Sequence, residues 1–142
     1  MAGITDITML LQSMEPTLQE EEYVFCSVQE DVLLRLQLNP LLQFKEKEGL
    51  TLIIEKRVAE RHSLQFEMSW RMITLNVHSD LAAVGFLAAI SSTLAKNDIS
   101  LNAVSAYYHD HLFVPSGKEA KAMQLLKRLS ISSIPQNQGR PY

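Results

Sequence analysis

The amino-acid sequence predicts an α+β fold in which one small unit occurs twice in tandem. Residues 17–28 match residues 93–104 at an offset of 76, and residues 51–54 match residues 111–114 at an offset of 60. Each match is weak by itself, but the two follow one another in the same order, which indicates a duplicated unit. Because the offsets differ by 16, the first copy is expected to carry that many extra residues inside its hairpin.

The second copy has the clearer pattern of strands and helices. Residues 71–77 alternate apolar and polar side chains, as a half-buried strand does. Ser79 or Asp80 can cap a helix, because their side-chain oxygens accept from free backbone N–H groups. The helix is predicted to run to residue 97, because small apolar side chains recur there every three to four positions. Residues 99–108 and 111–115 then predict two strands, joined by a tight turn at His109 and Asp110.

The end of the second copy is predicted from a helix-capping pattern. Ser116 and Glu119 have the spacing of a capping box, so the second helix is expected to begin at Ser116. Residues 131–134 are compatible with a short last strand. The polar tail at 135–142, marked by proline and glycine, is expected to be flexible.

The first copy begins with a helix at residues 5–13, and subtracting 76 from the strand at 71–77 leaves no room for an opening strand. Residues 65–77 therefore predict one long strand that closes the first copy and opens the second. The other expected elements are a strand at 23–28, a leucine-rich insert at 29–39, strands at 41–45 and 50–54 around a charged turn, and a short helix at 56–62.

The order β-α-β-β-α-β, with right-handed crossovers, gives each copy an antiparallel sheet with both helices on one face. The predicted architecture is thus two tandem ferredoxin-like (βαββαβ) repeats, at 1–70 and 71–134, the first lacking its opening strand. A sheet shared between the copies, or with a second subunit, would cover the strand edge that results.

Composition and charge limit the function. With 142 residues and 46% apolar content the chain can form an ordinary core, and its apolar stretches are far shorter than the ~20 residues that cross a bilayer. The start has no positively charged region typical of a signal peptide, and the single cysteine, Cys26, lies in a predicted strand as a core thiol would. We therefore expect a cytoplasmic protein that does not contact a membrane.

The net charge of −3 is unevenly distributed. Residues 1–70 hold 12 acidic and 6 basic residues, whereas residues 71–142 hold 4 acidic and 7 basic residues. Opposite charges favour docking between the two halves, within one chain or between chains. The alternative is that these charges are scattered over solvated faces. Nucleic-acid binding is not expected, because no basic stripe with interleaved aromatic residues is present in the sequence.

The loop after the strand at 71–77 is the predicted ligand site. The backbone N–H groups of Ser79, Asp80 and Leu81 lie at a predicted helix N-terminus, which favours a carboxylate or other anion. Gly85 and its small neighbours allow a close approach, and Asn102 on the next strand can donate and accept. The alternative is that Ser79 and Asp80 only cap the helix and that Gly85 only packs. A second possible location is the stretch of Glu48, Gly49 and Thr51 in the first copy.

The histidines suggest a different function. His109 and His111 can share one face of a strand, and with His78 or Asp110 they could bind a metal ion in a small metal-dependent enzyme. The alternatives are a structural or solvated turn, or contacts at an interface. No serine or cysteine has an evident base beside it, so we expect no catalytic residues, and neither a metal nor another cofactor. A third hypothesis is a pure dimerisation module without a ligand.

Several stretches resemble the ACT family of regulatory domains, and in particular bacterial stand-alone tandem ACT proteins. They are residues 73–85, 99–104 and 107–115 in the second copy and 44–54 in the first. The resemblance implies a non-catalytic module that forms a homodimer, binds an amino acid or similar effector between ACT units, and regulates a protein partner. The ligand contacts expected on this basis are Ser79, Asp80, Leu81, Val84, Gly85, Asn102, Glu48, Gly49 and Thr51.

Overall fold

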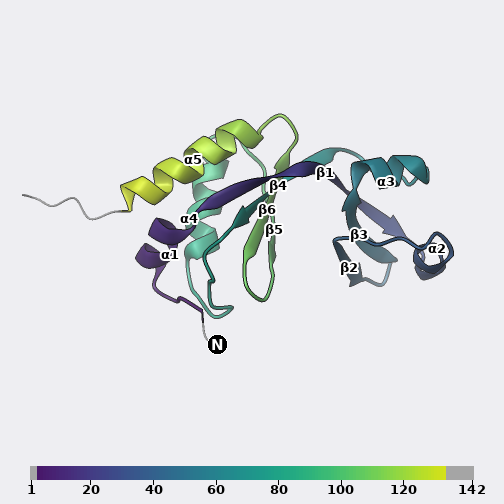
Figure 1. Ribbon diagram of the computed structural model, residues 1–142, viewed down its shortest axis with the longest axis horizontal. Coiled ribbons are helices and arrows are strands. Elements are labelled where there is room, and N and C mark those ends of the chain that lie inside the picture. Colours follow the sequence, from purple (N-terminus) through teal and green to yellow (C-terminus); the bar gives the residue numbers. More distant parts are fainter. Residues whose placement is uncertain (1–2, 134–142) are drawn as a thin grey trace, which may run out of the picture.

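A single six-stranded antiparallel sheet runs through the whole molecule, with its strands in the order β2-β3-β1-β4-β6-β5 (Figure 1). The computed structural model describes residues 3–133. In chain order the elements are α1 (Ile7–Ser13), β1 (Pro16–Val28), α2 (Glu30–Arg35), β2 (Leu42–Lys45), β3 (Leu50–Glu55), α3 (Lys56–Arg61), β4 (Ser69–Leu75), α4 (Phe86–Ala95), β5 (Asn102–Ser105), β6 (Asp110–Pro115) and α5 (Glu119–Ser132).

Two strands, β1 and β4, are shared by the two lobes seen in Figure 1. The first part of β1 pairs with β4 in the lobe that contains α4 and α5, and its second part pairs with β3 in the lobe that contains α2 and α3. The strand orders β4-β1-β3-β2 and β1-β4-β6-β5 are therefore the same arrangement, in which each lobe borrows the other's first strand as its last. The predicted tandem ferredoxin-like fold is confirmed.

The strand pairing decides between the two offsets of the repeat. β2 and β3 occupy the same sheet positions as β5 and β6, and both pairs are 60 residues apart. The offset of 76 is wrong, because β1 lies in the centre of the sheet whereas β5 lies at its edge. In the described part of the chain no strand precedes α1, as predicted. The first lobe does have an opening strand, however, because β1 occupies that position in the sheet.

Three predicted boundaries are also wrong. α4 begins at Phe86 with Gly85 as its N-cap, and not after Ser79 or Asp80. The Asp80 carboxylate instead accepts from the Ala82 N–H within the loop. α5 begins at Glu119 with Lys118 as its N-cap, because the Ser116 hydroxyl forms a 2.9 Å hydrogen bond with the Ser69 hydroxyl instead of capping the helix. α5 also continues to Ser132 where a last strand was predicted, and the predicted tail at 135–142 lies outside the described residues.

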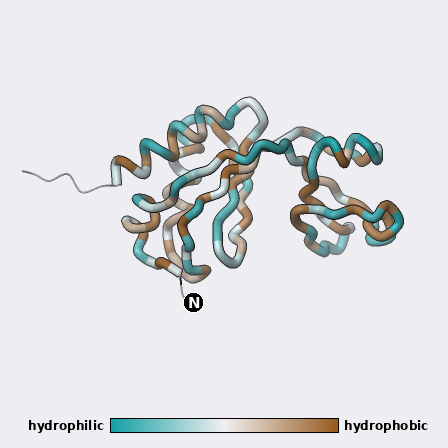
Figure 2. Tube along the Cα trace, in the orientation of Figure 1, coloured by the Kyte–Doolittle hydropathy of each residue, from teal (hydrophilic) through white to brown (hydrophobic). Residues whose placement is uncertain are grey.

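The helices all cover one face of the sheet. In the second lobe α1, α4 and α5 bury a core with β4 and β6, and in the first lobe α3 packs on β1 and β3. A third cluster lies on the opposite face, which no helix within residues 3–133 covers, and consists of Tyr23, Ile53, Met72 and Phe113. Figure 2 shows hydrophobic segments throughout both lobes, whereas the part of β1 that passes between the lobes is hydrophilic.

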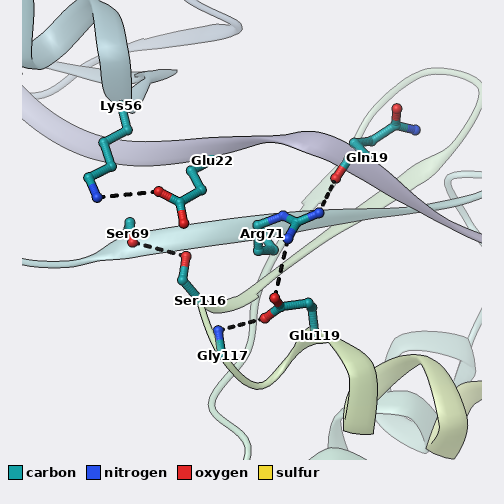
Figure 3. A network of polar contacts seen from close by, with 8 residues as sticks. All are labelled: Gln19, Glu22, Lys56, Ser69, Arg71, Ser116, Gly117 and Glu119. Carbon is teal, nitrogen blue, oxygen red and sulfur yellow. Dashed lines mark hydrogen bonds and ion pairs between the residues drawn. The ribbon is translucent and has the colours of Figure 1, made fainter.

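Arg71 holds the shared strands together where β1 is irregular (Figure 3). Between Leu18 and Glu22, β1 has three residues where β4 has only Met72. The Arg71 guanidinium donates to the Gln19 carbonyl at 2.8 Å and to the Glu119 carboxylate at 3.2 Å. Glu119 also accepts from the Gly117 N–H at 2.6 Å, so this network connects the bulge to the start of α5.

Candidate functional site

A small hollow of about 170 Å³ lies between the loop that follows β4 and the turn end of the β5–β6 hairpin. It is the place where the structure gathers most of the loop residues that the sequence singled out. Its lining consists of Ser79, Asp80, Leu81, Ala83, Gly85, Phe86, Leu87, Ala88, Ser105 and Asp110.

The N-terminal segment fixes the loop in place. The Ile4 N–H donates to the His78 carbonyl at 2.9 Å, and the Asp80 N–H donates to the Ile4 carbonyl at 2.9 Å. Gly3 is required beside them, since a Cβ there would lie 2.6 Å from the Asp80 nitrogen. The Ser79 N–H donates to the Val77 carbonyl at 3.1 Å. Two of the three backbone amides predicted to bind an anion, those of Ser79 and Asp80, therefore already have acceptors within the chain.

A buried carboxylate forms one side of the hollow. The Ser79 hydroxyl donates to Oδ2 of Asp110 at 2.7 Å, and the two residues are only 8% and 5% exposed. Asp110 is the first residue of β6 and shares the helix-facing side of the strand with Leu112 and Val114. A buried carboxylate is stabilised by hydrogen-bond donors or by a cation. This side of the hollow is therefore suited to a positively charged group.

The N-terminus of α4 forms another side. Gly85 ends the loop in the left-handed region, with φ of +91°, and no side chain caps the helix. The first backbone N–H groups of a helix have no intrahelical acceptor, and the helix dipole makes this end electropositive. Because Phe86, Leu87 and Ala88 line the hollow, this side is suited to an anion.

The predicted contacts fall into three groups. Ser79, Asp80, Leu81 and Gly85 line the hollow. Val84 is 85% exposed in the same loop and is not part of the lining, and Asn102 is exposed on the edge strand β5, where it pairs with Phe113. Glu48, Gly49 and Thr51 lie in the other lobe, around the turn between β2 and β3, where the Thr51 hydroxyl donates to the Glu46 carboxylate.

The sequence analysis names Asp110 only as a turn residue and a possible metal ligand, and does not include it in the amino-acid site. The alternation from 110 to 114 nevertheless puts it on the same face as two core residues. A carboxylate on the apolar face of a strand was the signal that could have identified it. The first turn of α4 was missed because the helix start was placed at Ser79 or Asp80 and not at Gly85.

The three histidines near the hairpin lie in different surroundings. The His78 ring packs on Tyr108 with centroids 5.3 Å apart, and the rings of His109 and His111 are 6.4 Å apart. His111 points to the helix-free face, where its Nδ1 is 3.0 Å from the Thr74 hydroxyl. Burial, and to a lesser degree the neighbouring His109, lower the pKa of His111. Within residues 3–133, no group of three potential ligand side chains is placed to hold a metal ion.

Comparison with known proteins identifies the family. Two ACT domain models match the chain in tandem, one over residues 2–71 and the other over residues 65–128. The chain belongs to the ACT domain family. The two matched segments of this ACT-domain protein overlap at residues 65–71, which include the first three residues of β4, the strand that both lobes use.

Solved structures share the fold. A Vibrio cholerae protein of unknown function, described as a possible transport protein, is 42% identical, with a TM-score of 0.78 over 87% of this chain and 94% of its own. The regulatory subunit of aspartate kinase from Thermus flavus is 5% identical, with a TM-score of 0.60 over 91% and 99% of the two chains. Aspartokinase III of E. coli, in complex with aspartate and ADP, is 12% identical, with a TM-score of 0.59 over 82% and 33%.

No curated protein matches the chain significantly. Among the helices within residues 3–133, none combines the length and the apolar character needed to span a membrane. The tandem ACT fold is shared with the regulatory subunit of aspartate kinase from Thermus flavus.

Proposed function

We propose that this tandem ACT protein is a non-catalytic regulatory module that binds a small amino acid in the hollow between the Ser79 loop and the β5–β6 hairpin. The observation that carries the proposal is the placement of a buried carboxylate, Asp110, and an uncapped helix N-terminus, that of α4, around one hollow. An α-amino acid carries both complementary charges on adjacent groups. In this arrangement the ammonium group lies against Asp110 and Ser79, and the carboxylate accepts from the first amides of α4.

The size of the hollow restricts the ligand. At about 170 Å³ it is close to the ~150 Å³ of an apolar cavity that accommodates benzene. A small amino acid fits this volume, and a tryptophan or arginine does not.

We further propose that a second copy of the chain completes the site. Large apolar side chains flank the hollow on both sides and remain exposed in one chain: Leu81, Val84, Tyr107 and Tyr108, between 60% and 85% exposed. A homodimer that covers them would close the hollow and place the effector between ACT units, so that occupancy changes the surface offered to a regulated protein partner in the cytoplasm. Light scattering is expected to find a species of twice 16.1 kDa. A monomer at micromolar concentration would contradict this assembly.

The test of the ligand is a thermal-shift panel of the proteinogenic amino acids. The matching amino acid, at 100 times its dissociation constant, is expected to stabilise the protein by ~2.7 kcal/mol. The Asp110→Asn variant keeps the shape of the side chain but loses its charge, so its affinity is expected to fall by about ten- to a hundredfold. Asp98→Asn is the matched control, because Asp98 is an exposed carboxylate in the turn after α4 and is not part of the hollow.

Two results would contradict the proposal. The first is a panel in which no amino acid shifts the melting temperature. The second is an amino acid that binds the wild type and Asp110→Asn equally well, which would place the site elsewhere, most simply at the turn of Glu48, Gly49 and Thr51.

A further inference from the structure

A second and larger cleft lies on the other side of the sheet, between the two lobes. It has a volume of about 340 Å³, and both lobes contribute to its lining. Leu42 and Ile53 of the first lobe face Met72, Val104, His111 and Phe113 of the second lobe. The cleft does not share a wall with the Ser79 hollow, since β6 directs Asp110 to the helix-covered face and His111 to the opposite face.

The floor of the cleft is already packed as a core. Ile53, Met72 and Phe113 are 1%, 7% and 1% exposed, although no helix covers this face of the sheet. Phe113 is held by two edge-to-face contacts, with Tyr23 at 6.0 Å and Phe25 at 5.7 Å between ring centroids. The sheet must therefore curl around this cluster, and the cleft is a preformed concavity and not an open flat face.

The chemistry of the lining excludes charge. No lysine, arginine, aspartate or glutamate lines the cleft, and the polar side chains that do so are Gln43 and His111. Nδ1 of His111 is engaged with the Thr74 hydroxyl, which also accepts from the Gln19 amide at 3.1 Å. Burial lowers the pKa of the His111 imidazole, which favours its uncharged form. A charged ligand would lose its hydration here without gaining a counter-charge.

We propose that this inter-lobe cleft binds a small, uncharged, largely apolar molecule with one hydrogen-bonding group, independently of the amino acid proposed for the other site. The volume is in the range of small-molecule pockets, and concave apolar sites with one or two polar groups, placed between domains, are the usual form of such pockets. It is about twice the ~150 Å³ cavity that holds benzene, which fits a ligand of about ten non-hydrogen atoms, such as an indole-sized bicyclic ring.

Indole is the probe for a direct test by NMR of the full chain with labelled methyl groups. Its titration is expected to give saturable shifts of the methyl signals of Leu42, Ile53, Met72 and Val104. Ala106→Leu places three extra carbon atoms in the cleft and is expected to weaken indole binding about tenfold or more. Ala103→Leu is the matched control, because Ala103 is exposed on the edge strand β5, which ends just before Ala106, and is not part of the cleft. The indole affinity of this variant should stay within about twofold of the wild type.

A second probe tests the charge argument. Indole-3-acetate has the same ring with a carboxylate, and it is expected to bind about tenfold or more weakly, since the cleft offers no cation. If Ala106→Leu does not fold, Val104→Ile, which adds a single carbon atom, replaces it.

Three outcomes would overturn the proposal. They are the absence of saturable shifts at the cleft methyl groups, unchanged indole affinity in the cleft variant, and cleft methyl signals that move on dilution of the protein without indole. The last result would show that a second copy of the chain occupies the cleft.

Discussion

The Ser79–Asp110 pair is the main departure, at the scale of single residues, from an otherwise apolar interior. The carboxylate lies on the helix-facing side of β6, next to the fully buried Leu112 and Val114, and receives a 2.7 Å hydrogen bond from Ser79. A structural role would be served as well by an apolar residue at either position. The proposed amino-acid site depends on these two polar groups together with the uncapped start of α4.

Removal of the hydroxyl tests how much the pair contributes to stability. Ser79→Ala leaves the buried Asp110 carboxylate without this donor and is expected to lower the free energy of unfolding by about 1–3 kcal/mol. Ser92→Ala is the control, since Ser92 is exposed on α4 and alanine is favoured in helices, so this change should be neutral or slightly stabilising. Urea unfolding curves measure both, and equal stability of the two variants would show that the pair contributes nothing.

His111 predicts a pH dependence of stability. Its pKa is lowered in the folded protein by burial, and further by His109, while Asp110 acts in the opposite direction. Protonation therefore favours the unfolded chain. The stabilising contribution is complete above the ordinary pKa of 6.5 and is lost as the pH falls through that value towards the lower folded value. Urea unfolding at pH 7.5 and pH 5 should show this loss in the wild type, a smaller loss in His111→Gln, and an unchanged loss in the control His62→Gln.

At the scale of elements, the positions of β3, β4 and β6 could be predicted from the sequence, whereas the starts of α4 and α5 could not. Alternation and β-branched residues located β3, β4 and β6 within a few residues, because those signals depend on burial of the strand itself. The starts of α4 and α5 depend on tertiary contacts instead. The loop before α4 is held by Ile4, and Ser116, at the predicted cap of α5, bonds to Ser69. Partners distant in the sequence replaced the local capping patterns.

Gly85 sets the start of α4, and its replacement tests that role. Gly85→Ala forces a side chain into a backbone with φ of +91° and brings Cβ to 3.2 Å from Cδ1 of Ile7 on α1. Gly117→Ala is the matched control, because it has a similar φ of +98° but nothing within 4 Å of the added atom. Each should destabilise by about 1–2 kcal/mol from the backbone alone, with the additional loss confined to Gly85→Ala. If thermal unfolding shows that Gly117→Ala destabilises the protein more than Gly85→Ala does, the close contact with Ile7 of α1 does not add to the cost.

At the scale of the whole molecule, the sequence predicted a duplicated unit but not how the copies interlock. The long strand predicted at 65–77 was the correct indication of sharing, and β4 does serve both lobes. β1 serves both lobes as well, which the misleading offset of 76 concealed. A shared strand is recognised by its non-local pairing. The local pattern of residues 16–28 therefore does not distinguish a strand shared by both lobes from a strand that belongs to one lobe.

Shared strands predict that the two lobes unfold together. Trp70, the single tryptophan, lies in β4 beside the strand crossing, so its fluorescence reports on this region, whereas far-UV circular dichroism reports on all helices and strands. The urea transitions from the two signals should coincide. A fragment of residues 71–142, which lacks α1 and β1, should remain unfolded by NMR dispersion. Two separate transitions, or a folded fragment, would show that the lobes are independent.

The bulge in β1 has a consequence for how this chain can change in length. Its three residues opposite Met72 are two more than the ladder needs, and two is an even number. Leu18 before the bulge and Val24 after it therefore point to the same side of the sheet, beneath the helices of their respective lobes. A single inserted residue would reverse this parity and turn Val24 and Cys26, the side chains of β1 buried beneath the helices of the first lobe, to the opposite face of the sheet. The crossing strands thus tolerate extra residues in pairs, and any odd insertion must fall in the loops outside them.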